Sequence, residues 1–259
     1  MRFILLFISI ALYAFAGHAQ DDENSLYEKH DKFPSYFGLQ IKPLIPTSLM
    51  GTKNLLLRQD NLIAEFEQKT GYSFGASVRV GITKLISIET GINFVQRKYH
   101  YNFSVPDSNL VAERDFRIIS YDLPVNALFY IQLGKNFYMN ASLGVAIVYN
   151  PTEIRTQVNL PGLNKFIQEG RRYSRFAFEA NANVGFEYRT EKSGIIYLGI
   201  SSRVPFKPIF KVAASYENQG MKTVAIGDIN GSYLSLDLRY YLPNVKRKGP
   251  QFIPGPITQ

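Results

Sequence analysis

The segment FAFEANANVGFEY, residues 176–188, has an apolar side chain at every even position and a small or polar one at every odd position. A period of two is that of a β-strand with two unlike faces. Strands of about five or six residues are typical of soluble proteins, whereas a tilted strand that crosses a lipid bilayer needs about 9–11. In a bilayer the apolar face would contact lipid and the polar face would line a barrel interior.

Seven further segments repeat this alternation, at residues 36–42, 71–82, 85–96, 118–131, 137–149, 194–203 and 232–242. We therefore predict an all-β fold, a transmembrane antiparallel up-and-down β-barrel of eight strands over residues 34–242. Pro124 falls inside the fourth segment. Proline cannot donate to a strand ladder, so we expect a bulge or kink there.

Short and long connections alternate along the chain. Those after the second, fourth and sixth segments are short, whereas residues 45–70, 98–116, 150–173 and 204–231 form long connections. Transmembrane barrels have short periplasmic turns and longer outer loops. The last connection contains strand-like pieces and an Asn230–Gly231 turn signal. It predicts either a hairpin above the membrane, which we prefer, or an added strand pair that makes ten.

The amino terminus has the pattern of a secretory signal peptide. Arg2 precedes an apolar stretch, and small residues come before an expected cleavage between Ala19 and Gln20. We assign residues 1–19 to the signal peptide, 20–33 to a flexible periplasmic lead-in and 243–259 to a disordered periplasmic tail. A secreted, aromatic-rich chain with amphipathic strands is expected in the outer membrane, as a multi-strand integral protein.

Aromatic residues at outward positions test this topology. With a periplasmic amino terminus they fall into two girdles, as the interface preference of aromatic rings predicts. The periplasmic girdle would contain Phe37, Phe129, Phe137, Phe186, Tyr188 and Tyr240. The outer girdle would contain Tyr72, Phe74, Phe94, Phe176 and Phe178.

Charged residues near the strand centres all occupy the alternate positions that face the barrel interior, which we call the inward parity. An outward Arg or Lys at the middle of the membrane would cost about 2–4 kcal/mol. Eight strands leave an interior just wide enough for side chains to fill. We therefore predict an interior polar network in place of an open pore, made of Arg79, Glu89, Asp122, Glu179, Asp237 and Arg239.

The remaining chemistry of the chain is sparse. The basic residues that give the formal charge of +8 are scattered, so nucleic acid is not an expected partner. No cluster has metal-ligand spacing and no glycine-rich phosphate loop precedes a helix, so no cofactor is expected. His100 lies near Ser104 and Asp107, but proximity in one loop is a weak substitute for a spatial triad. We do not expect an enzyme.

Two stretches carry a resemblance to a known family. SIETGINFVQRKYHY contains Glu89-Thr90-Gly91-Ile92, and YDLPVNALFYI contains Tyr121-Asp122-Leu123-Pro124. With these motifs the chain resembles the PorT-like outer-membrane β-barrel family of Bacteroidota. The resemblance covers about residues 34–242. It implies an eight-stranded barrel and, through the named member, a part in type IX secretion. Seventeen residues follow Leu242, which departs from barrels that stop on a terminal aromatic.

Three functions remain open from the sequence. The preferred one is a structural or interaction role in the outer membrane, with lipid and secretion or envelope-assembly proteins as partners. A small-solute pore is the alternative, and it needs an interior with fewer large side chains. A lipid-modifying enzyme that depends on His100 is the third.

Overall fold

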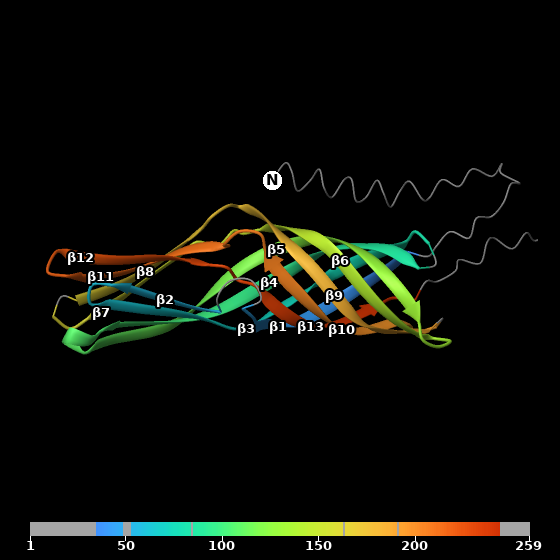
Figure 1. The fold of residues 1–259 in the computed structure, drawn as a ribbon, viewed down its shortest axis with the longest axis horizontal. Coiled ribbons are helices and arrows are strands. Elements are labelled where there is room, and N and C mark those ends of the chain that lie inside the picture. The colour runs from blue at the N-terminus through green and yellow to red at the C-terminus, as the bar shows by residue number, and fades with distance from the viewer. Residues whose placement is uncertain (1–34, 49–52, 84, 163, 191, 244–259) are drawn as a thin grey trace, which may run out of the picture. The chain divides into compact units, whose positions relative to one another are not determined.

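The computed structural model describes residues 35–48, 53–83, 85–162, 164–190 and 192–243 (Figure 1). The predicted signal peptide, the lead-in and the tail after Pro243 lie outside the described residues. None of the described residues forms a helix long and apolar enough to cross a membrane. The described strands are β1 (Ser35–Pro46), β2 (Asn54–Gln59), β3 (Leu62–Gly81), β4 (Ile86–Val105), β5 (Leu110–Gln132), β6 (Phe137–Tyr149), β7 (Ile154–Leu160), β8 (Asn164–Arg172), β9 (Phe176–Thr190), β10 (Gly194–Pro205), β11 (Phe210–Asn218), β12 (Met221–Ile229) and β13 (Tyr233–Tyr241), with a 3-10 turn, η1, at Pro106–Ser108.

Eight of these strands form a closed ring. Their order is β1, β13, β10, β9, β6, β5, β4 and β3, and β3 pairs with β1 to complete the circle. Every neighbouring pair is antiparallel. The closing ladder runs from Ser35 opposite Val80 to Leu44 opposite Gly71. The predicted all-β antiparallel barrel is therefore confirmed.

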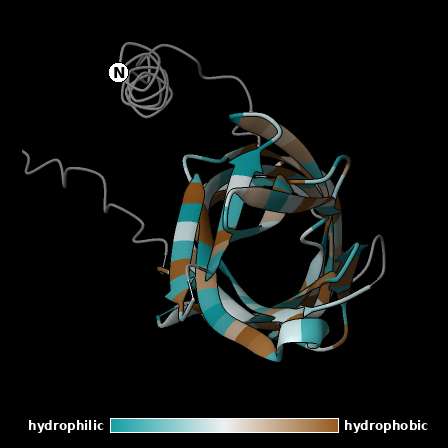
Figure 2. Ribbon diagram, turned by 90° about the vertical axis from the view of Figure 1, so that its left-hand side faces the viewer, coloured by the Kyte–Doolittle hydropathy of each residue, from teal (hydrophilic) through white to brown (hydrophobic). Residues whose placement is uncertain are grey.

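Each ring strand has one apolar face and one polar face, and hydrophilic and hydrophobic residues alternate along the ribbons in Figure 2. In β9 the outward Phe176, Phe178 and Phe186 are 61%, 54% and 47% exposed, whereas the inward Glu179 and Glu187 are 1% exposed. Exposed apolar residues on every strand of a ring define a surface that lipid can cover.

One strand of the ring contains an extra residue. The register between β3 and β4 shifts between Lys69 and Tyr72, which marks a bulge in β3. Gly71 lies at this bulge, and a Cβ atom there would come 2.2 Å from the carbonyl oxygen of Gln96. Only glycine fits so close an approach. In β3 the residues that face inward have even numbers before the bulge, such as Phe66, and odd numbers after it, such as Ser73.

Pro124 is accommodated without a bulge, because the register is kept on both sides of the strand. On the β6 side Pro124 stays in register opposite Ala146. On the β4 side Thr90 pairs with Val125 and Asn93 pairs with Asp122, and the two intervening pairs are missing from a ladder that keeps its register. The proline thus removes pairing locally without displacing the strand.

The first three long connections were predicted as loops and form or extend β-hairpins instead, whereas for the last connection a hairpin was the preferred prediction. Residues 98–116 continue β4 and β5, the first connection forms the β2–β3 hairpin, and the third forms the β7–β8 hairpin. The last connection forms the β11–β12 hairpin, which belongs to a second sheet and not to the ring. That sheet has the order β12-β11-β8-β7. We call the end of the ring from which these hairpins extend the far end, and the end with Ser35 and Tyr241 the near end.

The hairpins pack into a two-sheet sandwich with its own apolar core. One layer is β2 with the far parts of β3, β4 and β5, and the other is the second sheet (Figure 1). Gly227 of β12 lies against Leu55 and Leu57 of β2. The buried core includes Leu62, Phe66, Tyr101, Phe103, Val105, Phe116, Phe166, Phe210, Val212 and Ala214.

The loop prediction failed because the two faces of the strands exchange polarity. In β4 the inward residues change from Glu89 and Asn93 to Tyr101 and Phe103, whereas the outward residues change from Ile92 to polar ones. Lipid surrounds the ring and water surrounds the sandwich, so the apolar face must be outward in one and inward in the other.

Candidate functional site

The six interior residues predicted from the sequence are all buried inside the ring, and none is more than 3% exposed. They are Arg79, Glu89, Asp122, Glu179, Asp237 and Arg239. The structure gathers them into two connected clusters, one toward the near end and one toward the far end.

Arg79 is the centre of the near cluster. Its guanidinium donates to Glu89 at 3.0 Å and to Glu187 at 2.8 Å, and to the hydroxyl of Tyr241 at 2.9 Å. Arg239 donates to the other oxygen of Glu89 at 2.6 Å. Arg79 is on β3 and Glu187 is on β9, which lie four strands apart in the eight-membered ring. This ion pair therefore crosses the full width of the interior.

Asp237 extends the near cluster toward the middle of the ring. It accepts hydrogen bonds from Arg239 at 2.5 Å, Ser201 at 2.5 Å and Ser235 at 2.7 Å. The ammonium of Lys42 lies 3.3 Å from the same carboxylate. A carboxylate with this many donors is fully compensated despite complete burial.

The far cluster repeats the arrangement with other residues. Arg97 lies 2.6 Å from Glu179, and Arg203 lies 2.8 Å from Asp122 and 3.9 Å from Glu179. Asn93 donates to Asp122 at 2.5 Å. The Arg97–Glu179 and Arg203–Asp122 pairs also join strands that are not neighbours in the ring, β4 with β9 and β5 with β10.

The buried charges of the described residues balance. The cations are Lys42, Arg79, Arg97, Arg203 and Arg239, and the anions are Glu89, Asp122, Glu179, Glu187 and Asp237. Burying an unpaired charge costs several kcal/mol, so equal numbers in mutual contact are the arrangement that a filled interior requires. The sequence prediction omitted Lys42, Arg97, Glu187 and Arg203, although all have the inward parity. Continuing the alternation to the ends of each segment would have found them.

Large side chains fill the remaining interior space. The Tyr197 hydroxyl donates to Asn183 at 2.6 Å. A Cβ atom at Gly185 or Gly199 would come within 2.3 Å of that hydroxyl. The two glycines therefore make room for one tyrosine inside the wall.

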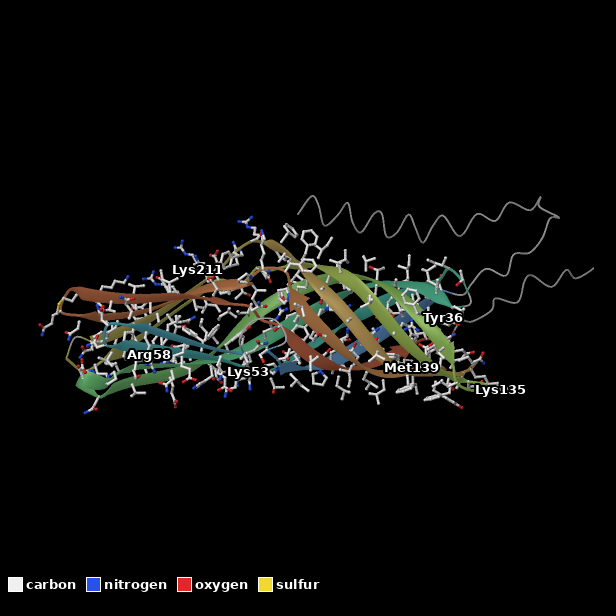
Figure 3. All side chains as sticks on the ribbon, viewed as in Figure 1. Tyr36, Lys53, Arg58, Lys135, Met139 and Lys211 are labelled. Atoms are coloured by element: carbon white, nitrogen blue, oxygen red, sulfur yellow. The ribbon has the colours of Figure 1, made fainter. Side chains whose placement is uncertain are left out.

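The near end of the ring is hollowed, and Arg79 of the near cluster is among the residues that line the hollow. A hollow of about 450 Å³ opens there, lined by Tyr36, Tyr130, Tyr138, Arg79 and Arg189 among others. The Arg189 guanidinium lies 4.0 Å from the centre of the Tyr138 ring and 4.6 Å from that of Tyr130. Figure 3 labels Tyr36 near this end. The hollow stops where Arg79 meets its carboxylates.

The far end of the interior is closed by the sandwich core. Arg97 donates to the carbonyl oxygen of Gly231 at 3.1 Å and lies 5.0 Å from the ring centre of Tyr233. The next inward residues of β4, Tyr99 and Tyr101, already belong to the apolar core. Ion pairs and apolar packing thus follow one another along the axis of the ring.

We call the predicted periplasmic girdle the near girdle and the predicted outer girdle the far girdle. The residues of both lie on the outer surface of the ring. In the near girdle Phe137 stacks on Phe186 at 5.6 Å, and all six members are 41–49% exposed: Phe37, Phe129, Phe137, Phe186, Tyr188 and Tyr240. In the far girdle the rings make a series of contacts through Tyr72, Phe74, Phe94 and Tyr121, and Phe176 contacts Tyr149 at 5.4 Å. Phe178 is also exposed on this side.

His100 does not contact Ser104 or Asp107. Its Nδ1 atom lies 2.8 Å from Asp115 on the neighbouring strand, and Asp107 is in η1 at the tip of the hairpin. Hydrogen bonds from Lys98 and His100 hold the pKa of the Asp115 carboxyl below its usual value. The three residues therefore do not form the triad considered from the sequence, and this surface group is an ion-pair cluster on the outside of β4 and β5.

A closed antiparallel ring with a lipid-facing surface, two aromatic girdles and buried ion pairs defines an integral β-barrel membrane protein. A family model described as "Outer membrane protein beta-barrel domain" matches residues 38–211. The chain belongs to this family of outer-membrane proteins, and it is an integral protein of the outer membrane.

Three solved structures are similar to the chain at low sequence identity. The outer membrane protein OprG from Pseudomonas aeruginosa is 10% identical over 82% of this chain and 98% of that chain, with a TM-score of 0.49. The β domain of the Bordetella autotransporter Brka is 10% identical over 83% and 100%, with a TM-score of 0.31. The transport unit of the autotransporter AIDA-I from Escherichia coli is 9% identical over 90% and 97%, with a TM-score of 0.23. No curated protein sequence matches the chain.

Proposed function

We propose that the chain is an outer-membrane scaffold whose ring anchors a β-sandwich that binds a protein partner. The ion pair between Arg79 and Glu187, across the width of the ring, carries the proposal. A ring filled in this way serves as an anchor, and the sandwich is the part left free to make contacts. In keeping with the PorT-like resemblance, we propose a partner in type IX secretion or envelope assembly.

The filled interior argues against the alternative of a small-solute pore. A pore needs a continuous aqueous path, but two clusters of paired charges cross the ring and an apolar core follows them. Opening a path would require a buried ion pair to separate, and each charge left buried without its partner would cost several kcal/mol. Steady single-channel currents from the purified protein in planar bilayers would contradict this reasoning.

The proposal also places the termini in the periplasm and the sandwich outside the cell. This orientation is supported by the short connections at the near end, since transmembrane barrels have short turns on the periplasmic side. It includes no catalytic step. A changed lipid A profile in a His100→Ala strain would contradict that part.

Site-specific photo-crosslinking in cells tests the partner and its position together. A crosslinking residue at Gln157, exposed on β7, should capture a protein of the secretion or envelope machinery. The same residue at Lys135, in the near-end turn labelled in Figure 3, should not. Leu198, which is 53% exposed on the lipid-facing surface, provides the background. If a partner protein is captured at Lys135 and not at Gln157, the docking surface lies at the near end, and the proposed role of the sandwich is refuted.

A further inference from the structure

A group of basic side chains lies just beyond the far girdle, on one side of the molecule. Arg171 is the last but one residue of β8, Arg175 precedes β9, Lys207 follows β10 and Lys211 is in β11. All four are exposed. We call these four residues the boundary patch. Figure 3 labels Lys211.

The backbone holds the patch together. Lys211 and Arg171 are directly opposite in the β8–β11 ladder. The segments that carry Arg175 and Lys207 run side by side, because Tyr173 donates to the Ile209 carbonyl at 3.4 Å and Phe206 donates to the Phe178 carbonyl at 3.1 Å. Four cations from two stretches of the chain, residues 171–175 and 207–211, therefore share one small area.

The positive charge of the patch is only partly offset within the protein. None of the four residues has an ion-pair partner among the residues that the structure describes. Asp228 lies opposite Lys211 in the β11–β12 ladder and accepts from the Tyr173 hydroxyl at 2.7 Å, so its charge offsets part of that of Lys211. The other two nearby carboxylates pair with cations outside the patch, Glu153 with Arg172 at 3.1 Å and Glu169 with Arg155 at 3.3 Å.

The other side of the ring differs at the same level. On β3 and β4 the cations nearest the far girdle are Lys69 and Lys98, and each has a carboxylate partner. Lys69 lies 2.6 Å from Glu67, and Lys98 lies 2.8 Å from Asp115. Arg117 on β5 is exposed and has no such partner among the described residues. The four cations of the boundary patch therefore form a larger group without ion-pair partners than the cations of this side.

Exposed aromatic rings border the patch on its membrane side. Phe176 is 61% exposed and Phe206 is 62% exposed. Aromatic rings at this level mark the boundary between hydrocarbon and headgroups. Arg and Lys directly on the water side of such rings lie at the height of lipid headgroups, where phosphate is the anionic group that they recognise.

We propose that the boundary patch binds the phosphate-bearing headgroup of a glycolipid in the far-end leaflet, with Arg175 and Lys207 contacting the phosphate. Phe176 and Phe206 pack against its acyl chains. This site is independent of the proposed function, because lipid binding does not require a protein partner.

Native mass spectrometry of the full chain in mild detergent tests the proposal, with lipid A as the probe. The R175S/K207S variant should bind lipid A about thirtyfold more weakly, since each cation near the surface contributes about a factor of five to anionic-lipid affinity. The control variant R58S/K222S also loses two exposed cations, but at the tips of the sandwich away from the membrane. Its affinity should stay within about twofold of the wild type.

Other outcomes decide against the site. Equal weakening by both variants would show a general charge effect and would overturn the proposal. Phosphatidylcholine has a headgroup without net charge, and if it bound as tightly as lipid A, the anionic charge of the phosphate would not be what the patch recognises. Inorganic phosphate as an equal competitor would indicate a soluble-anion site. The charge-keeping variant R175K/K207R should retain most of the affinity, and its failure to bind would indicate that these positions are needed only for folding.

Discussion

Replacing Arg79 with methionine should strongly destabilise the ring. Arg79 is 2% exposed and contacts the carboxylates of Glu89 and Glu187 and the hydroxyl of Tyr241. The substitution keeps an apolar stem of similar length but removes the cation. Arg239 still pairs with Glu89, and Arg189 and Asn140 still contact Glu187, so each carboxylate keeps a donor while the buried groups carry one negative charge in excess. Breaking a buried pair from one side costs about 3–5 kcal/mol, and we expect a loss near the lower end of that range.

A second substitution separates the charge effect from packing. In the double variant R79M/E187Q the buried charges balance again, so we expect it to be more stable than R79M alone, by roughly half of the loss. Arg155→Met is the surface control. Arg155 lies 3.3 Å from Glu169 with 71% of its side chain exposed, and exposed pairs contribute about 0–1 kcal/mol.

Urea unfolding of the protein in lipid vesicles measures these free energies. The chain has no tryptophan, so far-UV circular dichroism is the suitable signal for the loss of strands. A loss below about 1 kcal/mol for R79M, or equal losses for R79M and R155M, would refute the view that the paired charges stabilise the interior. A double variant less stable than R79M would show that Glu187 has another role.

Three further substitutions test other parts of the molecule. Phe103→Ala, at a fully buried core position, should cost the sandwich about 3–5 kcal/mol and make it sensitive to protease while the ring stays inserted. Ile200→Arg, on the 55% exposed lipid-facing surface, should lower the unfolding free energy in vesicles by about 2–4 kcal/mol. Asp115→Asn should make stability less dependent on pH in acid. The folded pKa of Asp115 is depressed below 3.8, so its pairing stabilises the protein above that pH and is lost as the pH falls through the folded pKa. The effect should stay under about 1 kcal/mol because the side chain is 46% exposed.

Controls for the first two of these tests use exposed positions of the sandwich. Val111→Ala, at a 58% exposed position of β5, should leave the sandwich resistant to protease. Gln157→Arg, on the water-exposed side of β7, should not change the unfolding free energy by more than about 0.5 kcal/mol. Protease resistance of the F103A sandwich equal to that of the wild type would contradict the assignment of a separate apolar core.

Strand alternation predicted the ring because a period of two depends only on local sequence. The eight ring strands occupy the eight segments in which apolar and polar residues alternate. The same rule failed beyond the girdle, where the apolar residues of β4 move to the inward parity at Tyr99 and Phe103. If a strand is predicted only where the apolar residues face outward, the predicted strand ends at that exchange. The backbone itself continues as a strand.

The sequence predicts which charged residues face the interior of the ring, but it does not predict which of them pair with one another. Parity places Arg79 and Glu187 inside the ring, but 108 residues separate them in the chain. Which inward charges meet depends on the stagger of the strands around the ring, and alternation does not encode stagger. The bulge at Gly71 was hidden for a similar reason. A single glycine in a strand does not reveal how closely the carbonyl of Gln96 approaches it.

The exchange of polarity along β4 and β5 also fixes how deeply the protein lies in the bilayer. A displacement by one two-residue repeat, about 7 Å along a strand, would move Lys98 and Arg117 toward the level of the far aromatic rings. The opposite displacement would lift outward apolar residues such as Ile92 into water. Both movements are opposed, so the sandwich stands at one height above the surface, and any molecule that docks on it must reach that height.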